Sequence, residues 1–97
     1  MLAQRGEIND LIQAGNRVER ALFNKDEDAA SQHEQWYKDA QSALKRLGLT
    51  ECLDEFVFPE RSGSMSYTGL SNQDSNRVTD VRDRVRALRR CVMQLGG

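Results

Sequence analysis

An apolar repeat in the last quarter of the chain constrains the fold more than any other feature. After Ser71, apolar side chains recur at alternating steps of three and four residues, at Val78, Val81, Val85, Leu88, Val92 and Leu95. This spacing is typical of a helix that buries one face. β-Branched residues form helices poorly, so packing must hold this helix, either inside the chain or against a second copy. We therefore predict a long helix over residues 72–95, capped by Ser71 with Asp74 or by Ser75 alone. For the second alternative, a homodimer, the candidate self-association residues are Val78, Val81, Val85, Leu88 and Val92.

A second helix is predicted around the only tryptophan, over residues 28–47. Its apolar residues share one face, at Trp36, Ala40, Ala43, Leu44 and Leu47. Ser31 and Glu34 have the spacing of a capping box at its start. Asn24 or Asp28 would instead open the helix a turn or two earlier.

Two glycines have expected structural roles. Gly48 can adopt the left-handed conformation that ends a helix, and Leu49 would then fold back onto Leu44. Gly15 belongs to the apolar face of a first helix over residues 5–23, formed by Ile8, Leu11, Gly15, Val18 and Leu22. At this position we expect another helix to approach closely, with a kink at the glycine as the alternative.

A short helical turn is predicted over residues 50–57, opened by Thr50. Pro59 cannot continue a helix and disfavours helical geometry at the residue before it. We therefore expect Phe56 and Phe58 to fold onto the same core as the tryptophan, where large aromatic side chains contribute much of the stability.

Together these elements predict an all-α fold of one domain, residues 1–97. A polar turn at residues 24–28 would join the first two helices into an antiparallel hairpin, and the long C-terminal helix would complete a three-helix bundle with a short extra helical turn. Residues 59–71 have the composition of a surface loop and lack the spacing of a phosphate-binding loop. Met65 and Tyr67 within that loop are candidate partner contacts.

The two cysteines, Cys52 and Cys91, lie 39 residues apart without local Cys or His neighbours. Because the N-terminus lacks the layout of a signal peptide, we expect both to be reduced and packed as small hydrophobic residues, with a disulfide as the alternative. A cytoplasmic location follows from the same reasoning. The sequence contains no apolar run long enough to span a membrane, so no membrane association is expected.

Charge is distributed unevenly along the chain. Residues 77–97 carry six Arg and two Asp, a net charge of +4, whereas residues 1–76 carry eight Lys or Arg and thirteen Asp or Glu, a net charge of −5. Four arginines fall on one side of the C-terminal helix, beside its valines: Arg82, Arg86, Arg89 and Arg90. They are candidate partner-binding residues for an acidic protein surface, or, as a less favoured alternative, for nucleic acid. The structural alternative is that they pair with carboxylates of the chain itself, such as Glu51, Asp54, Glu55, Glu60 or Asp83.

No catalytic residues, metal ligands or cofactors are expected. His33 is the only histidine, and its place near the edge of an apolar face favours a capping or packing role. Nucleophilic catalysis would require Cys52 or Cys91 beside it, and the spacing gives no reason for that arrangement. No His and Cys cluster has the spacing of metal ligands. The sequence thus indicates a non-enzymatic protein.

One resemblance adds to this interpretation. After the helical hairpin, apolar residues are spaced as Trp36-x3-Ala40-x3-Leu44, followed by Leu47-Gly48 and Phe56. This layout resembles helical accessory modules of bacterial abortive-infection and other phage-defence proteins, and small phage or mobile-element proteins that act on such systems. The resemblance implies a regulatory or inhibitory binding role. From the sequence we therefore expect a small protein-binding module, with a nucleic-acid-binding regulator as the alternative.

Overall fold

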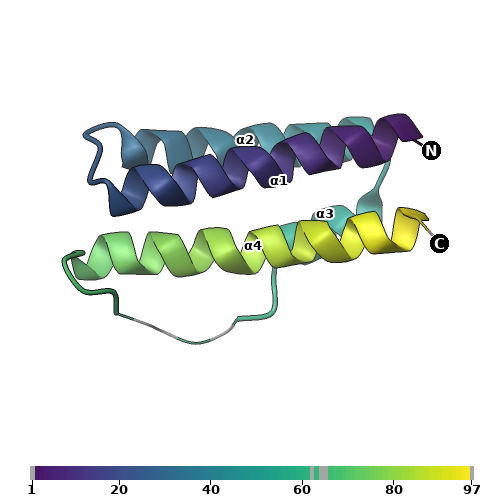
Figure 1. Ribbon diagram of the computed structural model, residues 1–97. Helices are drawn as coiled ribbons and strands as arrows, with labels where there is room; N and C mark the ends of the chain where they lie inside the picture. Colours follow the sequence, from purple (N-terminus) through teal and green to yellow (C-terminus); the bar gives the residue numbers. More distant parts are fainter. Residues whose placement is uncertain (1, 62, 64–65, 97) are drawn as a thin grey trace.

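The computed structural model describes residues 2–61, 63 and 66–96, which form four helices (Figure 1). They are α1 (Leu2–Phe23), α2 (Ala29–Arg46), α3 (Thr50–Val57) and α4 (Asn72–Gly96). α1 and α2 form an antiparallel hairpin, α4 runs back along α1, and the short α3 lies against the C-terminal half of α4. The predicted all-α bundle, with its hairpin, long C-terminal helix and short extra helix, is confirmed. As far as the structure describes them, none of these helices has the length and apolarity needed to cross a membrane.

The core lies where α1, α2 and α4 meet, and Trp36 is at its centre. The indole N–H donates a hydrogen bond to the carbonyl of Leu11 at 2.9 Å, so the polar atom of this buried side chain is satisfied. Gly15 lies directly beneath the indole. A Cβ at that position would be 2.8 Å from Trp36 Cζ2 and 2.8 Å from Val85 Cγ2. The expected close approach of another helix at Gly15 is therefore confirmed, and it involves both α2 and α4.

The valine face of α4 packs inside the chain. Val78, Val81, Val85 and Leu88 are all buried, whereas Val92 is only partly buried. α4 makes its most extensive packing with α1, which supplies the apolar surface that poor helix formers need. The first of the two alternatives, packing within one chain, accounts for this helix. Self-association through these residues stays a prediction.

The helix ends agree only in part with the expected caps. The Ser31–Glu34 capping box is wrong, because α2 already begins at Ala29 with Asp28 at the cap position. Ala29 is buried in the core and directly follows the tight turn after α1, where Lys25 has a φ of 58°. This packing starts the helix two residues before Ser31.

Other caps are confirmed or corrected in the same way. Gly48 has a φ of 73° and donates to the Lys45 carbonyl, and Leu49 donates to the Leu44 carbonyl at 3.1 Å. Those two bonds are the left-handed cap that was expected. Thr50, in contrast, is the first residue of α3 and does not cap it, because Leu49 takes the cap position. At the start of α4, Ser71 Oγ accepts from the Asp74 N–H at 3.1 Å, as expected.

The expectation of two reduced cysteines is wrong, because Cys52 and Cys91 form a disulfide. The bond joins α3 to α4, both cysteines are buried, and their Cα atoms are 5.6 Å apart, well within the range that a disulfide spans. The packing of α3 on α4 creates this proximity, and a separation of 39 residues gave no local sign of it.

Phe56 and Phe58 differ in their exposure to solvent. Phe56 is fully buried, and its ring centroid lies 5.5 Å from that of Trp36 and 5.7 Å from that of Tyr37. The expectation that Phe58 joins this core is wrong, because its side chain is 81% exposed. α3 ends at Val57, and Phe58 is the C-cap residue, with a non-helical φ of −121° and ψ of 67°. In the segment that follows the helix, Pro59 takes the buried position and Phe58 faces the solvent.

Candidate interaction surface

The four arginines named from the sequence lie on the outer side of α4. We call Arg82, Arg86, Arg89 and Arg90 the arginine strip, and all four are exposed. Met93 follows on the same side of the helix, three to seven residues beyond Arg86, Arg89 and Arg90, and is 76% exposed. The strip thus continues at its C-terminal end into an exposed apolar side chain.

On one side, the strip borders a groove between α1 and α4, with a volume of about 310 Å³. Three arginines and one glutamate line this α1/α4 groove, together with one asparagine and two core valines: Arg82, Arg86, Arg89, Glu19, Asn16, Val81 and Val85. The excess of arginine makes the groove basic. Its chemistry therefore suits a carboxylate or another anionic group.

On the other side, the strip borders a second groove of about 300 Å³, between α4 and the segment at the end of α3. This α3/α4 groove is lined by Glu55, Phe58, Pro59, Glu60, Asp83, Arg86, Ala87 and Arg90. One carboxylate oxygen of Glu55 is buried there without a hydrogen-bond partner in the described part of the chain. Arg86 lines both grooves, so it occupies the centre of the surface.

Within the strip, Arg82 is held by the chain itself. It pairs with Glu19 of α1 and donates to the Tyr67 hydroxyl at 2.8 Å, while its guanidinium lies 5.0 Å from the centre of the Tyr67 ring. The Phe23 ring lies at 5.8 Å. The hydrogen bond with Glu19 raises the pKa of Arg82 above its ordinary value. This arginine fastens the loop and α4 to α1.

The other three arginines are held less firmly. Arg90 pairs with Glu60 at 3.0 Å. Arg86 lies 3.7 Å from Asp83, beyond hydrogen-bonding distance. Arg89 makes no ion pair with any residue that the structure describes. The structural alternative is therefore supported for Arg82 through Glu19, for Arg90 through Glu60 and, at a longer distance, for Arg86 through Asp83. Because Arg86 is only weakly held and Arg89 is unpaired within the described chain, these two arginines retain most of their capacity to bind a partner.

The two loop residues named as candidate partner contacts differ in what can be said of them. Met65 lies outside the described residues. Tyr67 is half-buried, packs edge-on against Phe23 with ring centroids 5.4 Å apart, and donates its backbone N–H to Ser75 Oγ at 3.2 Å. Its visible contacts anchor the loop, and a contact with a partner stays a prediction.

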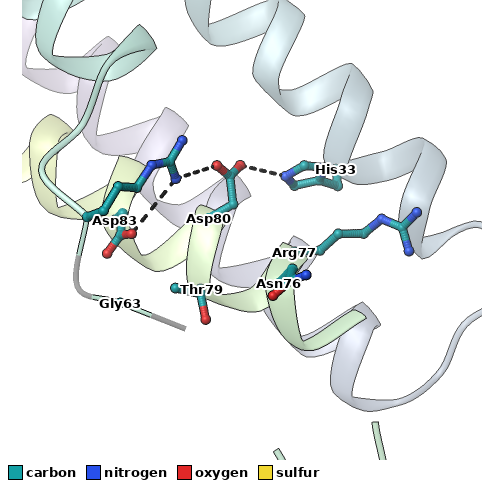
Figure 2. A pocket seen from close by; sticks show the side chains of 8 residues that line it. His33, Gly63, Asn76, Arg77, Thr79, Asp80 and Asp83 are labelled. Atoms are coloured by element: carbon teal, nitrogen blue, oxygen red, sulfur yellow. Dashed lines mark hydrogen bonds and ion pairs between the residues drawn. The ribbon is translucent and has the colours of Figure 1, made fainter. Parts of the chain in front are cut away.

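A third pocket, of about 440 Å³, opens beside His33, which comes from α2, and Asp80, which comes from α4 (Figure 2). Asp80 accepts hydrogen bonds from His33 Nε2, Arg84 and Arg61, each at 2.8 Å. Burial by itself raises the pKa of Asp80, but these three hydrogen bonds outweigh it and hold the pKa well below the ordinary value. Asp80 is therefore an ionised carboxylate whose charge is fully balanced by the chain, which indicates a structural role for this cluster.

Arg84 is the residue that the sequence interpretation missed. Its guanidinium is buried, donates to the Phe56 carbonyl at 2.6 Å, and lies 4.2 Å from the centre of the Tyr37 ring. It thus satisfies an orphan carbonyl at the C-terminus of α3, where a cation is also favoured by the helix dipole. A signal was present, because Arg84 lies three residues after Val81 and four before Leu88, on the buried side of α4.

The side chains considered from the sequence as catalytic candidates are already bonded to other groups of the chain. His33 is hydrogen-bonded to Asp80, and Cys52 and Cys91 are bonded to each other, so neither thiol is available as a nucleophile in this structure. Within residues 2–61, 63 and 66–96, no group of three or more His, Cys, Asp or Glu side chains is arranged to hold a metal ion.

Comparison of the chain with known proteins found no matching family model, no matching curated protein and no matching solved structure. The resemblance to accessory modules of phage-defence proteins therefore stays a prediction, and the physical character of the surface carries the functional interpretation.

Proposed function

We propose that this chain is a protein-binding module, and that the arginine strip, chiefly Arg86 and Arg89, binds an acidic surface of a partner protein. The observation that carries the proposal is that Arg89 is exposed and has no ion-pair partner within the described chain. It lies at the edge of a basic groove. A regulatory or inhibitory role for such a module agrees with the resemblance noted from the sequence.

The carboxylates around the strip favour a protein partner over nucleic acid. Glu19 flanks the arginines on the α1 side, and Glu55, Glu60 and Asp83 flank them on the α3 side. A nucleic-acid backbone presents phosphates along its whole length and would meet these carboxylates on both sides of the strip. A folded protein can place a few carboxylates opposite the arginines and other groups opposite the glutamates.

The test is a pull-down of the tagged protein from its native host lysate, with and without nuclease, using wild type and Arg86→Glu/Arg89→Glu. A stoichiometric protein that survives nuclease, is lost with the double variant and elutes as salt rises is the expected result. Because both arginines are exposed, their replacement should leave the melting temperature nearly unchanged.

A matched control is Arg5→Glu/Arg17→Glu, which makes the same change in net charge at exposed positions of α1. This variant should retain the partner. Loss of the partner with both double variants would mean that net charge, rather than the strip, controls binding. Recovery of nucleic acid that disappears on nuclease treatment would replace the proposal with the nucleic-acid-binding alternative.

A further inference from the structure

Phe58 is an exposed aromatic side chain on a backbone that is held on both sides. Before it, the Phe58 N–H donates to the Asp54 carbonyl at 2.9 Å, and Arg84 donates to the Phe56 carbonyl at 2.6 Å. After it, Pro59 is buried and Glu60 pairs with Arg90. The exposure of the ring is therefore fixed by the surrounding structure and does not result from a loose loop.

The disulfide strengthens this positioning. Cys52 lies in α3, less than two turns before Phe58, and its bond to Cys91 ties α3 to α4 beside the arginine strip. The segment that carries Phe58 cannot drift away from α4 while the bond is intact. A large apolar ring is thus presented to solvent at a fixed place.

Phe58 and Met93 border the exposed arginines from two directions. Phe58 shares the α3/α4 groove with Arg86 and Arg90, and Met93 lies one turn beyond Arg89 and Arg90 on the same side of α4. Isolated exposed apolar residues need no explanation, but two large ones beside exposed arginines form a composite surface. Aromatic, Met and Arg side chains are the types enriched at the centres of protein interfaces.

We infer that this composite surface, formed by Phe58, Arg86, Arg89, Arg90 and Met93, binds an amphipathic helix of the partner protein. The apolar stripe of that helix would cover Phe58 and Met93, and its acidic residues would pair with Arg86 and Arg89. The inference rests on the proposed function, and it adds the form and chemistry of the partner segment.

The surface suits a helix better than an extended peptide. Binding by strand addition requires an exposed strand edge, and the described part of the chain is entirely helix and loop. Binding of a proline-rich segment requires a groove lined by several aromatics, whereas Phe58 is the only aromatic side chain on this surface. From Arg86 to Met93 α4 rises about 10 Å, or two helical turns, so a partner helix that lies along it would present residues i, i+4 and i+7 to this surface.

The described surface of this chain offers no such helix to a second copy. Its exposed large apolar side chains are Phe23, Phe58 and Met93. Phe23 is engaged with Tyr67, and the other two belong to the composite surface itself. The occupant is therefore expected to come from a different protein.

The experiment is selection from a displayed library of random peptides of about 16 residues, four to five helical turns, on the disulfide-bonded wild-type protein. Enriched peptides are then synthesised, and their affinity is measured by fluorescence anisotropy for wild type, Phe58→Ser/Met93→Ser and Arg86→Glu/Arg89→Glu. Both double variants change exposed side chains, so circular dichroism should show an unchanged fold.

The expected peptides combine apolar residues at helical spacing with Asp or Glu beside them. Each double variant should weaken their binding by about tenfold or more. Acidic peptides without apolar periodicity, binding equally well to Phe58→Ser/Met93→Ser, would overturn the inference and leave the acidic-partner proposal standing. Failure to enrich any peptide whose binding depends on Arg86 and Arg89 would overturn both.

Discussion

Replacement of Arg84 by Ala should be among the most destabilising single changes in this chain. The guanidinium makes an ion pair with Asp80 at 2.8 Å, a hydrogen bond to the Phe56 carbonyl at 2.6 Å and a contact with the face of the Tyr37 ring at 4.2 Å. All three are lost together. The variant leaves a carbonyl at the end of α3 without its donor and a cavity between α3 and α4.

The magnitude follows from what each partner retains. Breaking a buried ion pair costs about 3–5 kcal/mol when the remaining charge is left uncompensated. Asp80 keeps His33 and Arg61 as hydrogen-bond donors, so the electrostatic part should be smaller, about 1–2 kcal/mol. An unsatisfied carbonyl adds about 1 kcal/mol, and the lost cation–π contact adds about 1 kcal/mol. We expect a total loss of about 3–4 kcal/mol, equivalent to about 12–30 °C in melting temperature for a domain of this size.

The assay is urea and thermal denaturation followed by circular dichroism at neutral pH, with the disulfide intact. Arg84→Lys should lose less than Arg84→Ala, because it keeps the charge but not the geometry that reaches both acceptors. Arg89→Ala is the matched control, since it removes an exposed arginine of the same helix and should change the free energy of unfolding by less than about 0.5 kcal/mol. A loss below about 1 kcal/mol for Arg84→Ala would refute the interpretation of Arg84 as a structural residue.

Three further predictions concern stability. Replacing Cys52 and Cys91 together by Ser should lower the free energy of unfolding by about 4 kcal/mol, by the loop-entropy relation for the 39-residue separation. Denaturation midpoints of the wild-type protein with and without reductant check this prediction. Equal midpoints would argue against a disulfide in the folded protein. Gly15→Ala should lower the free energy of unfolding by about 1 kcal/mol or more despite the better helix propensity of Ala, because the new methyl lies 2.8 Å from an atom of Trp36. A variant that is more stable than wild type in urea would contradict the close packing. Asp80→Asn should lower stability at neutral pH and flatten its decline in acid. The pKa of Asp80 is depressed in the folded state, so its contribution is fully present above the ordinary Asp pKa of about 3.9 and is lost as pH falls below that value; parallel acid-unfolding curves for the two proteins would exclude this role.

Helical periodicity predicted the fold because it is a local property of the sequence. The recurrence of apolar residues in α4 and the left-handed cap at Gly48 each depend on residues within one or two turns of the same helix. Gly15 was informative for a related reason. A glycine on an apolar helical face indicates a close neighbour, although the pattern did not identify Trp36 and Val85 as that neighbour.

The features that were missed depend on how α3 packs against α4. The disulfide requires that Cys52 and Cys91 face each other, and the exposure of Phe58 requires that Pro59 enter the core instead. The buried position of Arg84 depends on the end of α3 arriving beside α4. A loop of more than ten residues separates the two helices, so no local pattern specifies their register.

The disulfide also bears on where the chain functions. Stable structural disulfides are typical of proteins that fold in oxidising compartments, so the expectation of a cytoplasmic location loses the support that reduced cysteines would have given it. A cytoplasmic location and a permanent Cys52–Cys91 bond are in tension.

The two sides of α4 separate the structural and the binding roles of its charged residues. On the inner side, Asp80 and Arg84 balance each other and fix the end of α3. On the outer side, Arg86 and Arg89 are exposed and weakly paired or unpaired within the described chain. The inner pair positions the backbone before Phe58. The placement of Phe58 on the outer surface therefore depends on Asp80 and Arg84, although neither residue is part of that surface. Substitutions in the inner cluster should therefore weaken partner binding only when they also lower the free energy of unfolding. Substitutions of the outer arginines should weaken partner binding and leave the free energy of unfolding unchanged. Measuring both quantities for each variant separates the two roles.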